Sequence, residues 1–457
     1  MARDTTDETP IGDVEELAAY LASGCKPEAE WRIGTEHEKF PFLADTHDPV
    51  PYEGERSIKS LLQGMQKKLG WQPIMDEGNL IGLFEPNGMG AISLEPGGQF
   101  ELSGAPLVSI HETCRESNLH LAQLRQIADP LGIKFLGLGG SPKWTLADTP
   151  RMPKSRYDIM RAYMPTVGGQ GLDMMHRTST IQVNLDFSSE ADMRQKMQVA
   201  YRLQPVATAL FANSPFTDGK PNGLQSWRAD IWRDTDNDRT GVLPMVFSEN
   251  FGFIDYVEWV LDVPMYFVLR EGSYRDCTHV TFRQFMNGAL EGQVPDARPN
   301  KGDWTNHLST VFPEVRLKKF IEMRGADGGP WRRICALPAL WVGLLYDSAA
   351  LDAADELTRS WTYEDVVGLR DAVPAEGLAS QIKGQTVRDI SYEVLGIARK
   401  GLVARKKHNI DGFDEAHFLA PLEETVARGT TSAEQMLTLY NSVWESDIDR
   451  VFLEHAY

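Results

Sequence analysis

The chain has 457 residues, 42% of them hydrophobic, with 11 Trp and 19 Phe, so it can build a large core and is not a disordered chain. Its 65 acidic and 46 basic residues give a net charge of −19, which argues against nucleic acid or a membrane as a partner. The longest apolar run, Ile334–Tyr346, is shorter than the roughly 20 residues of a membrane span and predicts a buried helix.

Residues 1–10 are polar and acidic, unlike a targeting peptide, and we expect this segment to be disordered. Four cysteines in a chain of this length favour a reducing compartment, so we expect a cytoplasmic protein. The overall charge repels polyanions, so a polyanionic substrate would need local cations or metal ions.

Hydrophobic spacing predicts an alternation of helices and strands along the chain. Up to residue 211 we expect helices at 13–23, 57–69, 108–131, 155–163 and 191–211, and strands at 31–40, 80–85, 91–95, 99–102, 134–138 and 174–187. Pro86-Asn87-Gly88 is a hairpin turn signal. Further strands are predicted at 265–270 and from 320, and amphipathic helices from about 349 to the end.

The chain shows no linker between two halves, and its acidic strand segments are spread from residue 36 to residue 324. We therefore expect a single domain over residues 11–457 whose C-terminal part, from about 349, is helical. Because no regular strand–helix–strand alternation is present, the fold class is predicted to be α+β with a mainly antiparallel sheet.

The segment from Phe320 to Pro330 reads F-I-E-M-R-G-A-D-G-G-P. Side chains alternate along a strand, so Glu322 and Arg324 would share one face while the apolar residues between them face the core. The glycines that follow would form a loop able to approach a ligand closely. An exposed ion pair would give the same pattern, so this strand alone does not establish a site.

Three other segments repeat the pattern of one polar face and one apolar face. Glu36 and Glu38 share a face, Gln99 and Glu101 share another with Glu95 just upstream, and the polar residues from Thr178 to Asp186 alternate with apolar ones. An antiparallel sheet does this when one side covers a core and the other faces water or a ligand. The acidic pairs favour a ligand.

Carboxylates without paired cysteines or closely spaced histidines suit Mg²⁺ better than zinc. Two or three magnesium ions could be held by the five acidic residues of these strands, namely Glu36, Glu38, Glu95, Glu101 and Glu322. Arg324 beside them would offset phosphate charge, which indicates a nucleoside triphosphate such as ATP, although a structural salt bridge to Glu322 is its alternative role. The P-loop, dinucleotide and hydrolase motifs are missing, and G-L-G-G-S-P-K-W at 137–144 matches none of them.

Longer strings closely resemble the plant-type glutamate–cysteine ligases, a branch also found in proteobacteria. The resemblance runs in order from about residue 11 to the C-terminus, and its strings are I-G-T-E-H-E-K-F at 33–40, I-S-L-E-P-G-G-Q-F-E-L-S-G-A-P-L at 92–107, M-M-H-R-T-S-T-I-Q-V-N-L-D-F at 174–187, F-P-E-V-R-L-K-K-F-I-E-M-R-G-A-D-G-G-P-W-R-R at 312–333 and A-L-P-A-L-W-V-G-L-L-Y at 336–346.

This resemblance implies a glutamine-synthetase-like fold, in which a curved antiparallel sheet forms a funnel surrounded by helices. It also implies ATP-dependent joining of the L-glutamate γ-carboxylate to the L-cysteine amine through γ-glutamyl phosphate, the first step of glutathione synthesis. Glu322 and Arg324 would be the catalytic residues in the matching motif, and positioning and electrostatics would supply most of the catalysis. A ligase of the same fold with another amine acceptor, or an inactive ligand-sensing relative, remains an alternative.

The remaining candidates are substrate-binding residues. Trp227-Arg228 matches the family's glutamate-recognition segment, where the guanidinium would grip the α-carboxylate and the indole would cover the aliphatic stem. Gln182 and Asn184 lie on the polar face of the predicted strand at 174–187 and would orient substrate or simply hydrogen bond within the core. Tyr157 and Arg161 are candidates by position only and would line the site or belong to an amphipathic helix.

In the plant members a redox-switch disulfide joins the H-E-T-C helix to the R-R-x-C segment, and this chain has both cysteines, Cys114 and Cys335. In a reducing compartment they could equally remain two buried thiols. A second bridge of some plant members is excluded, because Cys277 has no partner between residues 287 and 296. The chain would act as a monomer or as a redox-dependent homodimer.

Overall fold

The computed structural model describes residues 5–86 and 88–457. Its centre is an eight-stranded sheet in which every neighbouring pair is antiparallel. In spatial order the strands are β15 (Val315–Leu317), β16 (Ile321–Asp327), β8 (Thr180–Leu185), β1 (Ile33–His37), β6 (Phe100–Ser103), β5 (Ala91–Leu94), β4 (Asn79–Phe84) and β3 (Gln72–Asp76). The predicted α+β class with an antiparallel sheet is confirmed.

The two faces of this sheet differ as the alternation predicts. On β8, Ile181, Val183 and Leu185 are fully buried in the main core, while Gln182 and Asn184 point to the other side. Three long helices pack on the apolar side, α3 (Ile110–Ala128), α6 (Glu190–Leu210) and α11 (Trp331–Leu345). The polar side is thereby left for the site.

Shorter elements surround this centre. The helices before α11 are α1 (Val14–Ala22), α2 (Ile58–Leu69), α4 (Arg156–Tyr163), α5 (Gly171–Arg177), α7 (Trp227–Ile231), α8 (Phe253–Asp262), α9 (Phe282–Met286) and α10 (Lys301–Leu308). The small two-stranded sheets pair β2 (Phe40–Leu43) with β7 (Ile133–Leu136), β9 (Phe216–Thr217) with β10 (Lys220–Pro221), β11 (Thr240–Gly241) with β14 (Phe312–Pro313), β12 (Phe267–Arg270) with β13 (Ser273–Asp276), and β17 (Gln381–Ile382) with β18 (Gln385–Thr386).

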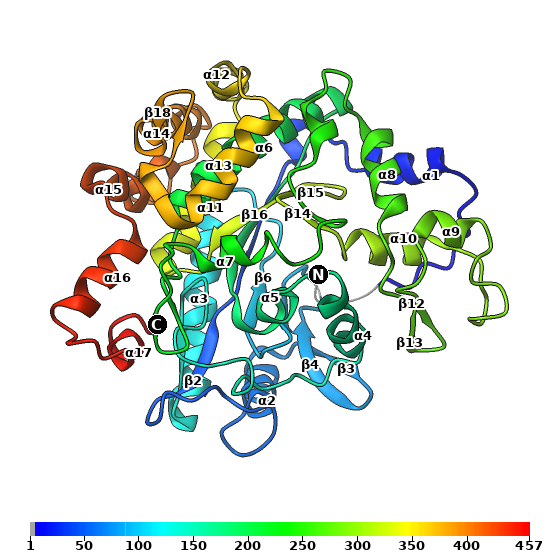
Figure 1. Cartoon of the computed structure of the whole chain (residues 1–457), viewed down its shortest axis with the longest axis horizontal. Helices are drawn as coiled ribbons and strands as arrows, with labels where there is room; N and C mark the ends of the chain where they lie inside the picture. Colours follow the sequence, from blue (N-terminus) through cyan, green and yellow to red (C-terminus); the bar gives the residue numbers. More distant parts are fainter. Residues whose placement is uncertain (1–4, 87) are drawn as a thin grey trace.

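The C-terminal part is helical, and its helices gather on one side of the molecule, coloured from golden yellow to red in Figure 1. They are α12 (Ser348–Thr358), α13 (Tyr363–Glu376), α14 (Val387–Ala404), α15 (Ala420–Arg428), α16 (Ser432–Asn441) and α17 (Asp449–Glu454). One cluster of buried side chains extends from Leu17 to Val426, so this part shares the core of the sheet. Within the described residues no single helix reaches the length and hydropathy of a membrane span, and only α11 and α12 together, bent by 89°, do so.

Three predictions differ from the structure. The strand expected at 174–187 begins only at Thr180, because Gly171–Arg177 forms α5, where Arg177 pairs with Asp173 one turn away. The strand from 320 continues through Gly325 to Asp327 with an irregularity after Met323, so the loop starts later than expected. Residues 5–10 are not disordered, since the backbone of Thr5, Asp7 and Thr9 hydrogen bonds to α10.

Two predictions concern residues outside the described part of the chain. Residues 1–4, the start of the segment expected to be disordered, are among them, and so is Asn87 in the predicted hairpin turn. The strands on either side of that turn, β4 and β5, pair as a hairpin as expected.

Candidate active site

The polar face of the sheet carries a continuous row of functional side chains across neighbouring strands. From β15 inward, Arg316 lies opposite Glu322, and Glu322 opposite Asn184. Glu36 then pairs with Gln182 on one side and with Ser103 on the other. Segments that are far apart in the sequence are therefore adjacent in space, as the alternating patterns predict.

A cavity open to solvent, with about 930 Å³ of empty space, lies over this row of side chains. Eight of the predicted site residues line it: Glu36, Glu38, Glu95, Glu101, Tyr157, Gln182, Arg228 and Arg324. The acidic groups come from β1, the segment after it, and the β5–β6 hairpin. Of these eight, the two arginines come from β16 and α7, and Arg156 of α4 and Arg316 of β15 line the cavity as well.

The acidic side of the cavity holds carboxylates that repel one another. Burial raises the pKa of Glu38 well above its usual range, and the charges of Glu95 and Glu101 raise it further. Burial likewise raises the pKa of Glu36, with Glu322 and Glu101 contributing. Hydrogen bonds fix these carboxylates, because Asn184 Nδ2 donates to Glu36 over 2.8 Å and the Thr180 amide donates to Glu38 over 3.0 Å.

Glu322 lies at the basic side and is fully buried beneath the cavity surface, not on it. Arg316 and Lys318 pair with its carboxylate at 2.7 and 2.8 Å, and Arg324 also bonds to it. Burial alone would raise the pKa of Glu322, but these three cations hold it well below its usual range. As placed, Glu322 holds the guanidinium groups of the cavity wall and does not present free oxygens to a metal ion, in contrast to its predicted role as a metal ligand. Arg324 bonds Glu322 and also lines the cavity, so the salt bridge does not remove it from the cavity wall.

Three predicted substrate-binding residues also lie outside the cavity lining. Asn184 is engaged by Glu36, and Arg161 pairs with Asp158 on its own helix. Trp227 packs beneath the guanidinium of Arg177, with 4.8 Å between Arg177 Cζ and the ring centroid. The indole that does line the cavity with Arg228 is Trp232, since residues four apart share a face of α7 and the residue after it.

Sequence reasoning missed several lining residues. Arg316 alternates between Val315 and Leu317 inside a quoted family string, so the pattern that singled out Arg324 could also have identified it. Met174 and Met175 line the cavity because α5 turns them toward it. Loop residues such as Ser309 and Thr310 had no periodic signal.

A second cavity of about 490 Å³ lies on the other side of the basic wall. Four residues line both cavities: Arg228, Trp232, Phe312 and Arg324. Arg370 adds a third guanidinium and is paired at 2.6 Å with Glu314, which also lines this cavity. The lining therefore carries an excess of positive charge and suits a carboxylate.

The acidic side of the cavity offers the type of ligand that a hard cation needs, but its side chains alone do not form a complete coordination sphere. Its donors are carboxylate oxygens, which Mg²⁺ prefers, and burial together with the charges of neighbouring carboxylates raises the pKa values of Glu36 and Glu38, an effect that a bound cation would offset. Among the described residues, however, no three acidic, histidine or cysteine side chains converge on one point. Mg²⁺ usually completes its shell with water and phosphate oxygens, so one or two carboxylates per ion suffice.

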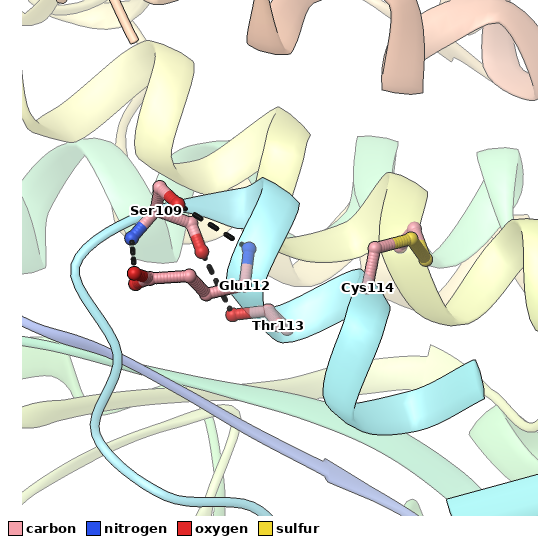
Figure 2. Close-up of a disulfide and its surroundings, with 5 residues drawn as sticks. Ser109, Glu112, Thr113 and Cys114 are labelled. Atoms are coloured by element: carbon pink, nitrogen blue, oxygen red, sulfur yellow. Dashed lines mark hydrogen bonds between the residues drawn. A yellow bond between two sulfur atoms is a disulfide. The ribbon is translucent and has the colours of Figure 1, made fainter. Parts of the chain in front are cut away.

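Behind the sheet, a disulfide joins α3 to α11 through Cys114 and Cys335, whose Cα atoms are 5.5 Å apart (Figure 2). The first turn of α3 is fixed by a capping box in which Ser109 and Glu112 satisfy each other's backbone amides (Figure 2). Of the expected alternatives, the structure has the bridge. Cys25 and Cys277 are free.

The model of the glutamate-cysteine ligase family 2 matches residues 32–454 of the chain. Glutamate–cysteine ligase A, chloroplastic, of Oryza sativa subsp. indica is 53% identical over 97% of this chain and 88% of the relative. Glutamate–cysteine ligase, chloroplastic, of Arabidopsis thaliana is 54% identical over 97% of this chain and 83% of the relative. The solved glutamate–cysteine ligase of Francisella tularensis in complex with AMP shares the fold, with a TM-score of 0.57, 14% identity and coverage of 92% of this chain and 87% of that one.

The expected cytoplasmic location is contradicted by these comparisons, because the matched relatives are named chloroplastic. Four cysteines indicate redox conditions at most, and two of them are bridged here, so the count could not identify a compartment. The fold and motif expectations agree with the comparisons, and the chain belongs to the glutamate–cysteine ligase family.

Proposed function

We propose that the protein joins the γ-carboxylate of L-glutamate to the amine of L-cysteine with ATP as the energy source, through γ-glutamyl phosphate. Family membership over nearly the whole chain supports the reaction class. The observation that carries the assignment of the site is one cavity with carboxylates on one side and guanidinium groups on the other. A reaction that brings a triphosphate to an amino-acid carboxylate needs both.

In this proposal Glu36, Glu38, Glu95 and Glu101 hold two or three Mg²⁺ ions with ATP. Magnesium would neutralise the charge of the phosphates at the acidic side of the cavity. Ser93 and Ser103 both donate to the Glu101 carboxylate, and so limit the directions in which its remaining lone pairs point. The Glu101 carboxylate is thus preorganised by one neighbour on β6 and one on the adjacent strand β5.

Arg316 and Arg324 would face the phosphate that is transferred. Both line the cavity, and both are held by Glu322. Arg324 Nη1 also donates to Gln182 over 2.8 Å, which fixes its plane toward β8. Charged donors held in place before the substrate arrives stabilise developing phosphate charge without reorganisation. Glu322 is proposed as the residue that holds them.

Arg228 would bind the α-carboxylate of glutamate from the second cavity. Arg228 is 3% exposed and lines both cavities, so its guanidinium can reach a ligand that extends from one cavity into the other. Trp232 would cover the aliphatic stem, in place of the predicted Trp227. The γ-carboxylate would then point toward the larger cavity, where the phosphate lies, while the amine acceptor enters from outside.

The reaction is tested with purified protein, ATP, Mg²⁺, L-glutamate and a panel of amines, following ADP release. ADP formation that depends on both glutamate and cysteine is expected. ADP formation with another amine would assign the chain a different acceptor, and no ADP with any amine would contradict the proposal.

We further propose that the Cys114–Cys335 bridge regulates activity and sets whether the chain is a monomer or a homodimer. The bridge ties α3 to α11, and both helices pack against β1, which carries Glu36. Activity and gel-filtration volume, each measured with and without dithiothreitol, are expected to change together. Unchanged activity after complete reduction would contradict this role.

A further inference from the structure

We propose that Asp327 is a positioning residue for Arg228: acting through Ser214 and Ser226, it fixes the start of α7 so that the Arg228 guanidinium stands in the wall between the two cavities. This inference rests on the proposed function only for the identity of the ligand that Arg228 meets.

Asp327 is the last residue of β16 and is 1% exposed. Its Oδ2 accepts from the Asn213 amide at 2.8 Å and from Ser214 Oγ at 2.7 Å, and its Oδ1 accepts from Ser226 Oγ at 2.8 Å. Burial raises the pKa of Asp327, and the nearby charge of Arg228 together with these three hydrogen bonds offsets the cost of burying the carboxylate.

The two serines carry the constraint from Asp327 to α7. A hydroxyl group has one proton, so a serine that donates to Asp327 turns its lone pairs elsewhere. Ser214 Oγ accepts from the Arg228 amide, and Ser226 Oγ, the N-cap of α7, accepts from the Ala229 amide, both over 3.2 Å. The first turn of α7 is therefore held by two hydroxyls that one carboxylate orients.

The same strand holds the other end of the arginine. Arg228 Nη2 donates to the backbone oxygen of Arg324 over 2.9 Å, and Arg324 lies three residues before Asp327 on β16. The backbone of Arg228 and its guanidinium are thus fixed to β16 at two points. Two attachments define both the position and the direction of the side chain, which one would not do.

The glycine-rich segment 137–144, which matches no nucleotide motif, supplies the space for this arrangement. A Cβ on Gly139 would overlap the Asp327 carboxyl group, and a Cβ on Gly140 would lie 2.7 Å from the Trp227 ring. Only glycine at these two positions lets Asp327 and α7 approach so closely.

The test compares Asp327→Asn with Arg228→Ala and the double variant, measuring kcat and KM for glutamate, cysteine and ATP. The substituted amide keeps the shape of the carboxylate but turns an NH₂ group toward groups that themselves donate hydrogen bonds. Asp327→Asn should therefore raise, roughly tenfold, the KM of the same substrate whose KM Arg228→Ala raises, and leave the KM values of the other two substrates unchanged. In the Arg228→Ala background the same substitution should change that KM by less than about twofold. Ser214→Ala and Ser226→Ala each remove one of the two serine hydroxyls that connect Asp327 to α7, and they replace Asp327→Asn in the test if that variant does not fold.

Asp303→Asn is the matched control, because Asp303 is a buried carboxylate that pairs with Arg270 outside both cavities. It should lower the melting temperature without changing any KM. A wild-type KM in Asp327→Asn, or the same fold-increase with and without Arg228, would overturn the inference. If Arg228→Ala raises the KM of another substrate, only the proposed glutamate assignment fails, and if it raises none, both fail.

Discussion

At the residue scale, Glu322 shows how the protein builds a positive wall inside an acidic chain. One buried carboxylate accepts from Arg316, Lys318 and Arg324, which leaves an excess of two positive charges around it. A buried ion pair is poor evidence of stability but good evidence of a fixed arrangement when its members line a cavity. Here the arrangement delivers two guanidinium groups to the cavity.

Glu322→Gln should lower kcat at least about 100-fold, because a neutral amide cannot hold three cations in place. It should also lower the free energy of unfolding by about 3 kcal/mol, the usual loss when one member of a buried pair is removed. Turnover and urea denaturation measure the two effects. Glu415→Gln is the control, since Glu415 is equally buried and paired with Arg405 but lines neither cavity. Near-normal turnover in Glu322→Gln would remove Glu322 from the site.

The raised pKa values of Glu36 and Glu38 predict that Mg²⁺ binding releases protons and strengthens as pH rises. At these two carboxyl groups the folded state holds more protons than the unfolded state above the ordinary carboxyl pKa, so their contribution to the stability of the metal-free protein should fall as pH rises through the pKa of Glu38. Calorimetric Mg²⁺ titrations in buffers of different ionisation enthalpy count the protons. Glu38→Gln should weaken Mg²⁺ binding and remove part of the pH dependence. An unchanged proton count would exclude Glu38 as a ligand.

At the scale of elements, strand alternation alone predicted the polar face of the sheet. Glu36, Gln182 and Arg324 lie on one face as expected, because side-chain direction in a strand follows from sequence parity. Trp232 could not be identified from sequence, since its place depends on where α7 begins, and α7 begins where the Ser226 hydroxyl caps it. The sequence also could not show that three cations pair with Glu322, because Arg316 lies on a neighbouring strand and only the fold sets the register of that strand.

The link between α3 and α11 leads to a prediction about stability. The bridged cysteines are 221 residues apart in sequence, and closing so long a loop stabilises a fold by about 2–5 kcal/mol. Cys114→Ser should therefore lower the melting temperature and abolish its response to dithiothreitol. Cys25→Ser, which removes a free and partly exposed thiol, should keep both properties of the wild type. An equal response to dithiothreitol in Cys114→Ser would place the redox-sensitive bond elsewhere.

At the scale of the whole molecule, the C-terminal helices and the sheet share one core. Buried residues of α12, α13 and α14 belong to the same cluster as the apolar face of β8, and α14 packs directly on α11. The amphipathic pattern after residue 349 predicted a helical C-terminal part. The pattern of each helix could not show, however, that these helices pack against the apolar core behind the eight-stranded sheet.

The chain is accordingly expected to unfold as a single unit in urea, by circular dichroism and by tryptophan fluorescence alike. A fragment of residues 1–348 should not fold, because it leaves the outer face of α11 exposed to water. Non-coincident transitions, or a soluble, cooperatively folded fragment, would contradict the single-domain proposal.

The shared basic wall has a thermodynamic consequence for the order in which substrates bind. Arg228 and Arg324 line both cavities, so an anion in one cavity alters the potential that an anion in the other meets. Linkage makes this influence mutual: whatever factor nucleotide applies to the dissociation constant of the amino acid, the amino acid applies to that of the nucleotide. Two anions bound on either side of the basic wall would repel each other and so disfavour simultaneous binding, and a divalent cation bound to the nucleotide would weaken that repulsion.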